Sequence, residues 1–189
     1  MLKKQRSASK APKGVGDSPQ LKKIRLALMD VDGVLTNGVV YHFALKEGLI
    51  EFKGVHAQDA IALAWLADCQ IKTGIISGRN SAGLAERLKA LKVSFIYQGR
   101  LDKKIVFDEI CRNSGISPDE TLYIGDDLPD IPVIKSAGIG IAVQNARPEV
   151  KQAAHWVTKN EGGKGAVREV AEAVLKAQGL WPKILETFR

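Results

Sequence analysis

Apolar residues along the chain form short continuous runs, and between these runs they recur every three or four positions. Continuous runs of this kind are typical of strands buried on both faces of a parallel sheet, and they lie near 24–29, 71–76, 93–97, 121–124 and 139–143. The periodic segments predict helices near 57–68, 80–91, 102–114, 129–136 and 146–153, with a final helix near 164–178. Because the two kinds of element alternate, the pattern predicts an α/β fold with a doubly wound parallel sheet.

One interval departs from this alternation. Residues 38–54 contain two short strand patterns joined by Lys46-Glu47-Gly48, which predicts a β-hairpin flap. No interval between the expected elements is long enough for an inserted cap domain, since independent domains usually need at least ~50 residues. The sequence therefore predicts a single capless domain, whose open edge a neighbouring subunit would have to cover.

The net charge of +7 is concentrated at one end of the chain. Residues 1–23 hold seven basic residues and one acidic residue, in a stretch rich in Ser, Pro, Gly and Lys. This composition predicts a disordered basic tail at 1–23, a folded domain at 24–180 and a short C-terminal tail at 181–189. The remainder is nearly balanced in charge, so neither a nucleic acid nor a membrane is an expected partner.

Two features bear on the expected location. The basic tail lacks the apolar core of a secretory signal, and no window reaches transmembrane length. Cys69 and Cys111 form no metal-binding motif, and each falls in an apolar helical pattern. They are expected to be reduced thiols, which predicts a cytoplasmic protein.

The most informative stretch follows the first expected strand and reads Asp30-Val31-Asp32-Gly33-Val34-Leu35-Thr36. Side chains at alternate positions of an extended chain point to the same side, so Asp30 and Asp32 can face one ligand. Ligand sites form at the carboxyl ends of parallel strands, whereas two unpaired carboxylates inside the core would be costly. Taken alone, the motif also fits a calcium-binding or turn-capping loop.

Three later strands end in residues of related chemistry. Ser77-Gly78-Arg79 ends a strand with a hydroxyl and a glycine; Ser77 could cap the next helix, and helix N-termini bind anions. Lys103 follows the next strand pattern, and Ile105, Val106 and Ile110 suggest an apolar face behind it, although a lone lysine is usually a solvated surface residue. Gly125-Asp126-Asp127, with Asp130, clusters the hard oxygens that Mg²⁺ requires, and an acidic loop capping a helix is the alternative.

In this order the four motifs resemble the four signatures of the haloacid dehalogenase superfamily of phosphatases, and the resemblance implies a Rossmann-like (HAD-like Rossmannoid) core. It implies that Asp30 is the nucleophile, forming an aspartyl phosphate, and that Asp32 is first the general acid and then the general base. It further implies that Mg²⁺ is held by Asp30, Asp126 and the backbone carbonyl of Asp32, with Asp127 and Asp130 orienting these ligands. Catalysis by Lys103 is also implied, and so are substrate contacts from Asp32, Thr36, Ser77, Gly78, Arg79 and Lys103.

Further segments narrow the resemblance to the capless phosphatases of 3-deoxy-D-manno-octulosonate 8-phosphate. These segments are Thr36-Asn37-Gly38, Tyr97-Gln98-Gly99, Ala146-Arg147-Pro148 and Gly162-Gly163-Lys164-Gly165-Ala166-Val167-Arg168-Glu169. The resemblance implies Mg²⁺-dependent hydrolysis of this sugar-acid phosphate, on the route to lipopolysaccharide. It also implies a homotetramer in which the hairpins line the centre.

The chain departs from that family just after the hairpin. The family commonly has an arginine there, associated with the carboxylate of the sugar acid, and Gln58 stands at its position. A glutamine lacks the bidentate cationic fork of arginine, and Lys53 or His56 could substitute for it. The exact sugar therefore stays open. A phosphatase for a nonulosonate 9-phosphate is one alternative, and a non-catalytic assembly module, like nucleotidyltransferase-fused relatives, is another.

Overall fold

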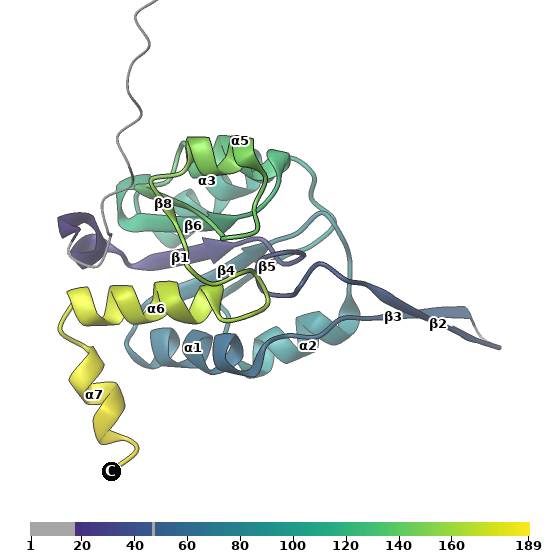
Figure 1. Ribbon diagram of the computed structural model, residues 1–189, viewed down its shortest axis with the longest axis horizontal. Helices are drawn as coiled ribbons and strands as arrows, with labels where there is room; N and C mark the ends of the chain where they lie inside the picture. Colours follow the sequence, from purple (N-terminus) through teal and green to yellow (C-terminus); the bar gives the residue numbers. More distant parts are fainter. Residues whose placement is uncertain (1–17, 47) are drawn as a thin grey trace, which may run out of the picture.

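The centre of the molecule is a six-stranded parallel sheet, seen in a computed structural model that describes residues 18–46 and 48–189 (Figure 1). The strand order is β5-β4-β1-β6-β7-β8, and every neighbouring pair is parallel. The strands are β1 (Leu26–Met29), β4 (Lys72–Ile76), β5 (Phe95–Tyr97), β6 (Thr121–Gly125), β7 (Ile139–Ala142) and β8 (Trp156–Val157). Every residue of β1, β6 and β7 is buried, which explains their continuous apolar sequences.

Helices cover both faces of this sheet. One face carries α1 (Ala57–Asp68), α2 (Ala82–Ala90) and α6 (Ala166–Ala177), and the other carries α3 (Lys103–Ser114) and α5 (Pro148–Ala153) (Figure 1). The short α4 (Ile131–Ile134) and the 3₁₀ turns η3 (Pro118–Glu120) and η4 (Leu128–Asp130) flank β6. The expected doubly wound α/β fold is therefore confirmed. Within the described ranges, none of the helices has both the length and the apolar character needed to cross a bilayer.

The ends of the folded part lie outside the boundaries expected from the sequence. Residues Pro19–Lys23 form the 3₁₀ helix η2, in which Leu21 is fully buried. The side-chain amide of Gln178 donates hydrogen bonds to the carbonyls of Leu21 (3.1 Å) and Ile24 (2.8 Å), which ties η2 to the end of α6. The folded domain therefore begins before residue 24, and residues 1–17 of the expected tail lie outside the described part of the chain.

The C-terminal segment also differs from the expected tail, because it forms the helix α7 (Trp181–Glu186). Ile184 is buried, and the ring of Trp181 packs edge-on against Trp65 of α1 at 5.7 Å between centroids. The two-residue strand β8 was likewise not expected, because so short an element leaves almost no periodicity in the sequence.

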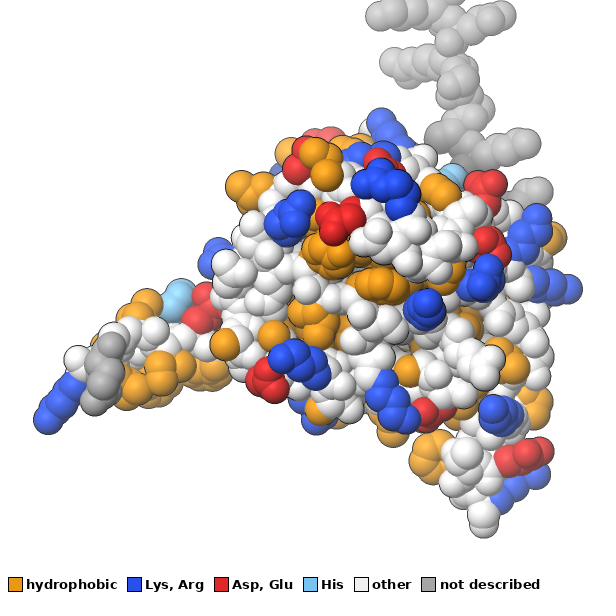
Figure 2. Space-filling model, turned by 180° about the vertical axis from the view of Figure 1, so that it is seen from behind, with side chains coloured by type: hydrophobic (Ala, Val, Ile, Leu, Met, Phe, Trp, Pro, Cys, Tyr) orange, Lys and Arg blue, Asp and Glu red, His pale blue; other side chains and the backbone are white. Residues whose placement is uncertain are grey.

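A β-hairpin projects from the body of the molecule (Figure 1). It consists of β2 (Tyr41–Leu45) and β3 (Gly48–Phe52), which pair antiparallel with Tyr41 opposite Phe52. Its apolar side chains are exposed and form an orange band along the projecting arm in Figure 2. The predicted flap is confirmed, and no cap domain is inserted among the described elements.

Candidate active site

The loop after β1 is built to bring two carboxylates to the edge of the sheet. The backbone N–H of Asp30 still donates to Ile124 of β6 (3.0 Å), and then the chain turns around the carbonyl of Val31, which accepts from the N–H of Thr36 (3.0 Å). Gly33 in this turn has φ +96°, and a Cβ there would lie 2.2 Å from Oδ2 of Asp126. The glycine is needed because the side chain of Asp126 comes so close to the turn.

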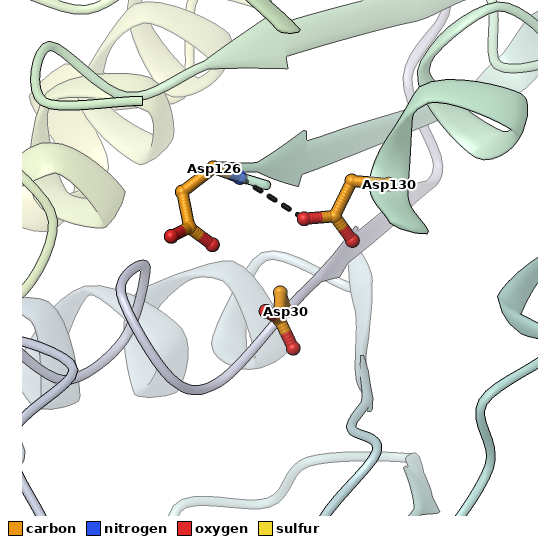
Figure 3. Close-up of side chains that lie close together, drawn as sticks. All are labelled: Asp30, Asp126 and Asp130. Carbon is orange, nitrogen blue, oxygen red and sulfur yellow. Dashed lines mark hydrogen bonds between the residues drawn. The ribbon is translucent and has the colours of Figure 1, made fainter. Parts of the chain in front are cut away.

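Three carboxylates converge at this edge (Figure 3). Asp30, Asp126 and Asp130 each offer one oxygen, and these oxygens lie within 4.8 Å of one another. They come from the ends of β1 and β6 and from η4. Carboxylates this close repel one another unless cations or hydrogen-bond donors compensate them.

Asp130 already has its full set of donors. One of its oxygens accepts from the hydroxyl of Tyr123 (2.6 Å) and from Nζ of Lys103 (2.7 Å). The other accepts from the backbone N–H groups of Asp126 (3.0 Å) and Asp127 (3.2 Å). Although its oxygen lies near the cluster, Asp130 is suited to orient its neighbours rather than to bind a metal. It also completes the capping box at the start of η4, in which Asp127 is the capping residue, so the alternative of an acidic capping loop is correct as well.

Lys103 supplies the positive charge of the site. It is the first residue of α3, whose N-terminus is capped by the Asp102 carboxylate. Its Nζ lies 2.9 Å from Asp30 and 2.7 Å from Asp130, and its side chain is only 6% exposed. Burial alone lowers the pKa of Lys103, but the two carboxylates outweigh burial and the pKa ends above its usual value. Lys103 is therefore a fixed ammonium, not the solvated lysine of the alternative reading.

The single charge of Lys103 does not neutralise the three carboxylates, so the site favours binding of a metal cation. Burial, together with the neighbouring carboxylates of Asp30 and Asp130, raises the pKa of Asp126 to about 7. Burial also raises the pKa of Asp30, to about 6, although Lys103 opposes the rise. Oδ1 of Asp126 is buried and has no hydrogen-bond partner among the described residues. An unpartnered buried oxygen beside a second carboxylate fits a hard divalent cation such as Mg²⁺.

A cleft of about 420 Å³ opens above these groups. It is lined by eight of the predicted site residues together with Leu101 and Pro129; the eight are Asp30, Asp32, Ser77, Gly78, Arg79, Lys103, Asp126 and Asp127. The four motifs therefore meet in one place, as the sequence predicted from their positions at strand ends.

Ser77 lies at the inner wall of this cleft. It is almost fully buried, and its hydroxyl oxygen accepts from the backbone N–H of Arg79 (3.2 Å). The next helix, α2, begins at Ala82 with Ser81 in the capping position. Ser77 therefore does not cap that helix, and its hydroxyl proton remains available to a ligand oxygen in the cleft.

Thr36 is the predicted contact that the structure does not bring to the cleft. Its side chain is fully buried, its hydroxyl donates to the carbonyl of Val31 (3.3 Å), and it accepts from the N–H of Gly38 (3.2 Å). Both functions of the hydroxyl are used within the turn itself. Thr36 thus shapes the loop that presents Asp30 and Asp32.

The three residues considered for the sugar carboxylate lie in different places. Nζ of Lys53 donates to Oδ1 of Asp32 at 2.7 Å, directly beside the cleft. Nδ1 of His56 faces the buried Asp59 at 3.7 Å, at the start of α1. Gln58 lines a separate hollow of about 460 Å³ along α6, which contains no other predicted site residue. Although that hollow is as large as the cleft, it lacks the converging carboxylates and the buried lysine.

Two functional contacts were not foreseen. Tyr123 binds Asp130, and the only sign of it in the sequence is a tyrosine inside an otherwise aliphatic strand. The contact between Lys53 and Asp32 joins the hairpin to the first motif, and nothing in the spacing of the two residues indicates it.

The comparisons with known proteins agree with this geometry. A family model described as haloacid dehalogenase-like hydrolase matches residues 92–170. The 3-deoxy-D-manno-octulosonate 8-phosphate phosphatase KdsC of Yersinia pestis is 38% identical over 155 residues, which are 82% of this chain and 81% of that protein. KdsC of Escherichia coli K12 is 37% identical over 158 residues, which are 84% and 82% of the two chains.

Solved structures give the same result. The 3-deoxy-D-manno-octulosonate 8-phosphate phosphatase of Moraxella catarrhalis, in complex with a magnesium ion, a phosphate ion and a KDO molecule, has a TM-score of 0.87 and 37% identity, covering 94% of this chain and 100% of that chain. The cobalt-bound enzyme of Haemophilus influenzae has a TM-score of 0.79 and 34% identity, covering 85% and 92%. The chain therefore belongs to the 3-deoxy-D-manno-octulosonate 8-phosphate phosphatase family of haloacid dehalogenase-like hydrolases.

Proposed function

We propose that this protein is a Mg²⁺-dependent phosphatase that hydrolyses 3-deoxy-D-manno-octulosonate 8-phosphate to 3-deoxy-D-manno-octulosonate and phosphate. The observation that carries the proposal is the contact of Lys103 with Asp30, 2.9 Å apart, beside the unsatisfied carboxylate of Asp126 in one cleft. A nucleophile, a fixed cation and a metal-ligand oxygen are the parts that phosphoryl transfer through an aspartyl phosphate requires. Family membership supplies the sugar-acid phosphate as substrate.

In this reaction a carboxylate oxygen of Asp30 attacks phosphorus, and the ester P–O bond breaks. Asp32 gives its proton to the leaving sugar oxygen, so the alcohol leaves neutral. Asp32 then takes a proton from a water molecule whose oxygen attacks the same phosphorus. The bond between Asp30 and phosphorus breaks, and inorganic phosphate leaves.

The phosphoryl oxygens would be held by groups that line the cleft. These groups are Ser77, the backbone of Gly78, Lys103 and Arg79, whose side chain is 58% exposed. Mg²⁺ would be held by the carboxylates of Asp30 and Asp126 and the carbonyl of Asp32. When bound, Mg²⁺ supplies neutralisation of the charge that phosphoryl transfer develops.

We also propose that the protein works as a homotetramer in the cytoplasm. The exposed apolar hairpin supports an assembly, because the cleft has no covering domain of its own among the described residues. The two cysteines, Cys69 and Cys111, are both free thiols, which suits a reducing compartment.

Steady-state hydrolysis of a panel of sugar-acid phosphates tests the proposed function. We expect the highest kcat/KM with 3-deoxy-D-manno-octulosonate 8-phosphate, and activity that disappears with a chelator and returns with Mg²⁺. Asp30→Asn keeps the shape of the side chain but removes the attacking charge, so it should abolish phosphate release in a folded protein.

The other readings give different results in the same panel. A higher kcat/KM with a nonulosonate 9-phosphate would identify that compound as the substrate instead. This outcome is worth testing because Gln58 stands in place of the family's arginine. An absence of phosphate release from every substrate would indicate the non-catalytic assembly module. Undiminished activity of Asp30→Asn, without deamidation, would contradict the assignment of the nucleophile.

A further inference from the structure

Lys53 joins the catalytic cleft to the hairpin. It follows directly after β3, and its Nζ donates to Oδ1 of Asp32 at 2.7 Å and lies 3.3 Å from Oε1 of Glu51. Its side chain is only 2% exposed. A buried lysine needs charged partners to offset its desolvation, and here two carboxylates enclose the ammonium.

The contacts continue outward as a row of alternating charges. Oε1 of Glu51 is buried and has no hydrogen-bond partner among the described residues, so its ion pair with Lys53 is its main compensation. Oε2 of Glu51 lies 4.0 Å from Arg79. A series of contacts therefore leads from the cleft to the hairpin and back to the second motif, and each residue in it lies next to one of opposite charge. The series is Asp32, Lys53, Glu51 and Arg79.

This arrangement does not suit Lys53 as the ligand of a substrate carboxylate. Its ammonium already faces two carboxylates, and it would have to leave Asp32 in order to bind a third. Within residues 18–46 and 48–189, Lys53 is also the one side chain that donates a hydrogen bond to the carboxylate of Asp32. It occupies Oδ1, so Oδ2 is the oxygen left to carry the proton that Asp32 transfers.

We propose that Lys53 is a positioning residue that orients the carboxyl group of Asp32 for proton transfer, and that Glu51 and β3 anchor it to the hairpin. The inference rests on the proposed phosphatase function. Proton transfer needs the carboxyl oxygen within hydrogen-bond reach first of the leaving oxygen and then of the attacking water. Without Lys53, Asp32 would rotate among several orientations, because its side chain is partly exposed to solvent.

Leaving-group dependence distinguishes this role from a general structural one. A sugar alkoxide needs a proton as it leaves, whereas p-nitrophenolate leaves without one. Lys53→Met keeps the apolar stem and removes the ammonium, and Lys53→Arg keeps a cation. With 3-deoxy-D-manno-octulosonate 8-phosphate, kcat of Lys53→Met should fall by at least about tenfold while KM changes by less than about twofold. Release of p-nitrophenol in the first turnover should stay near the parent rate, and Lys53→Arg should recover most of the lost kcat.

A matched control is Lys89→Met, which removes the same group from an exposed ion pair with Glu86 and should leave all rates unchanged. Melting temperature and light scattering verify the fold and assembly of each variant. If Lys53→Met does not fold, Glu51→Gln serves instead, because it weakens the contact that holds Lys53. Its kcat should fall by less, with the same dependence on the leaving group.

Three outcomes would overturn the inference. A raised KM with unchanged kcat would assign Lys53 to the substrate carboxylate. An equal loss of the first-turnover rate with both substrates, in Lys53→Met or in Glu51→Gln, would indicate a general disruption. An unchanged kcat of Lys53→Met, with an active parent protein, would refute this inference alone. A parent protein that is inactive on every substrate would refute the proposed function as well.

Discussion

Asp126 carries a buried carboxylate that the protein alone does not satisfy, and this has consequences for stability. Its pKa of about 7, and that of about 6 for Asp30, lie above the ordinary value of 3.8. The folded protein therefore binds more protons than the unfolded chain between about pH 4 and pH 7. Without a metal, these two groups make the fold less stable as the pH rises through that window.

Mg²⁺ binds the ionised carboxylates, so its stabilising effect should grow with pH. We expect saturating Mg²⁺ to raise the melting temperature more at about pH 8 than at about pH 6. Asp126→Asn should remove most of this rise and should make the metal-free protein more stable at the higher pH. Asp68→Asn, at an exposed pair with Lys92, is the control and should behave like the parent. Equal Mg²⁺ effects at both pH values would contradict the assignment.

Residues next to strand ends could be placed from the sequence, and those that act across the fold could not. Asp30 and Asp126 directly follow strands, and Lys103 begins the helix after a third strand, so the rule for parallel sheets brings them together. Thr36 follows the same rule, but its hydroxyl is used within its own turn, and no motif shows that. Lys53 reaches Asp32 because the chain returns from the hairpin to the edge of the sheet just after β3.

At the scale of the elements, the start of α6 depends on another helix. Its capping position is Gly165, which has no side chain to offer, and the buried Asp59 of α1 accepts from the N–H groups of Gly165 (3.1 Å) and Arg168 (2.7 Å). The preceding glycines pack on the catalytic loop: a Cβ on Gly162 would lie 1.7 Å from the carbonyl oxygen of Gly33. The glycine-rich motif was visible in the sequence, but its reason, a close approach of two backbones, was not.

Removing this cap should therefore destabilise the fold. Asp59→Ala leaves buried N–H groups without an acceptor, and we expect the free energy of unfolding to fall by about 1–3 kcal/mol. Asp59→Asn should lower the free energy of unfolding by less, because the amide keeps one acceptor oxygen. It also removes a buried charge, and burial raises the pKa of Asp59 despite the backbone donors, so that charge is costly. Chemical denaturation of both variants measures the difference. An alanine variant as stable as the parent would show that α6 does not need this cap.

At the scale of the whole molecule, the hairpin is the feature that a single chain does not explain. One of its faces carries Tyr41, Phe43, Leu45, Ile50 and Phe52, which are each about half exposed or more. The rings of Tyr41 and Phe52 stack at 5.1 Å, so the face is ordered, yet nothing else in the described chain covers it (Figure 2). A projecting apolar face of this kind favours self-association.

Phe43→Lys tests this view by placing a charge at the centre of the face. Burying the ammonium without a partner would be costly, so the variant should be a monomer by light scattering, whereas we expect the parent to be a tetramer. Ala44→Lys is the matched control, because Ala44 lies on the opposite face of the same strand and the assembly should survive there. Since a neighbouring subunit is expected to cover the open cleft, the monomer should also have a higher KM for the sugar-acid phosphate. A parent protein that is a fully active monomer would refute the proposed assembly, and an Ala44→Lys variant that dissociates as readily as Phe43→Lys would show that the apolar face is not the contact.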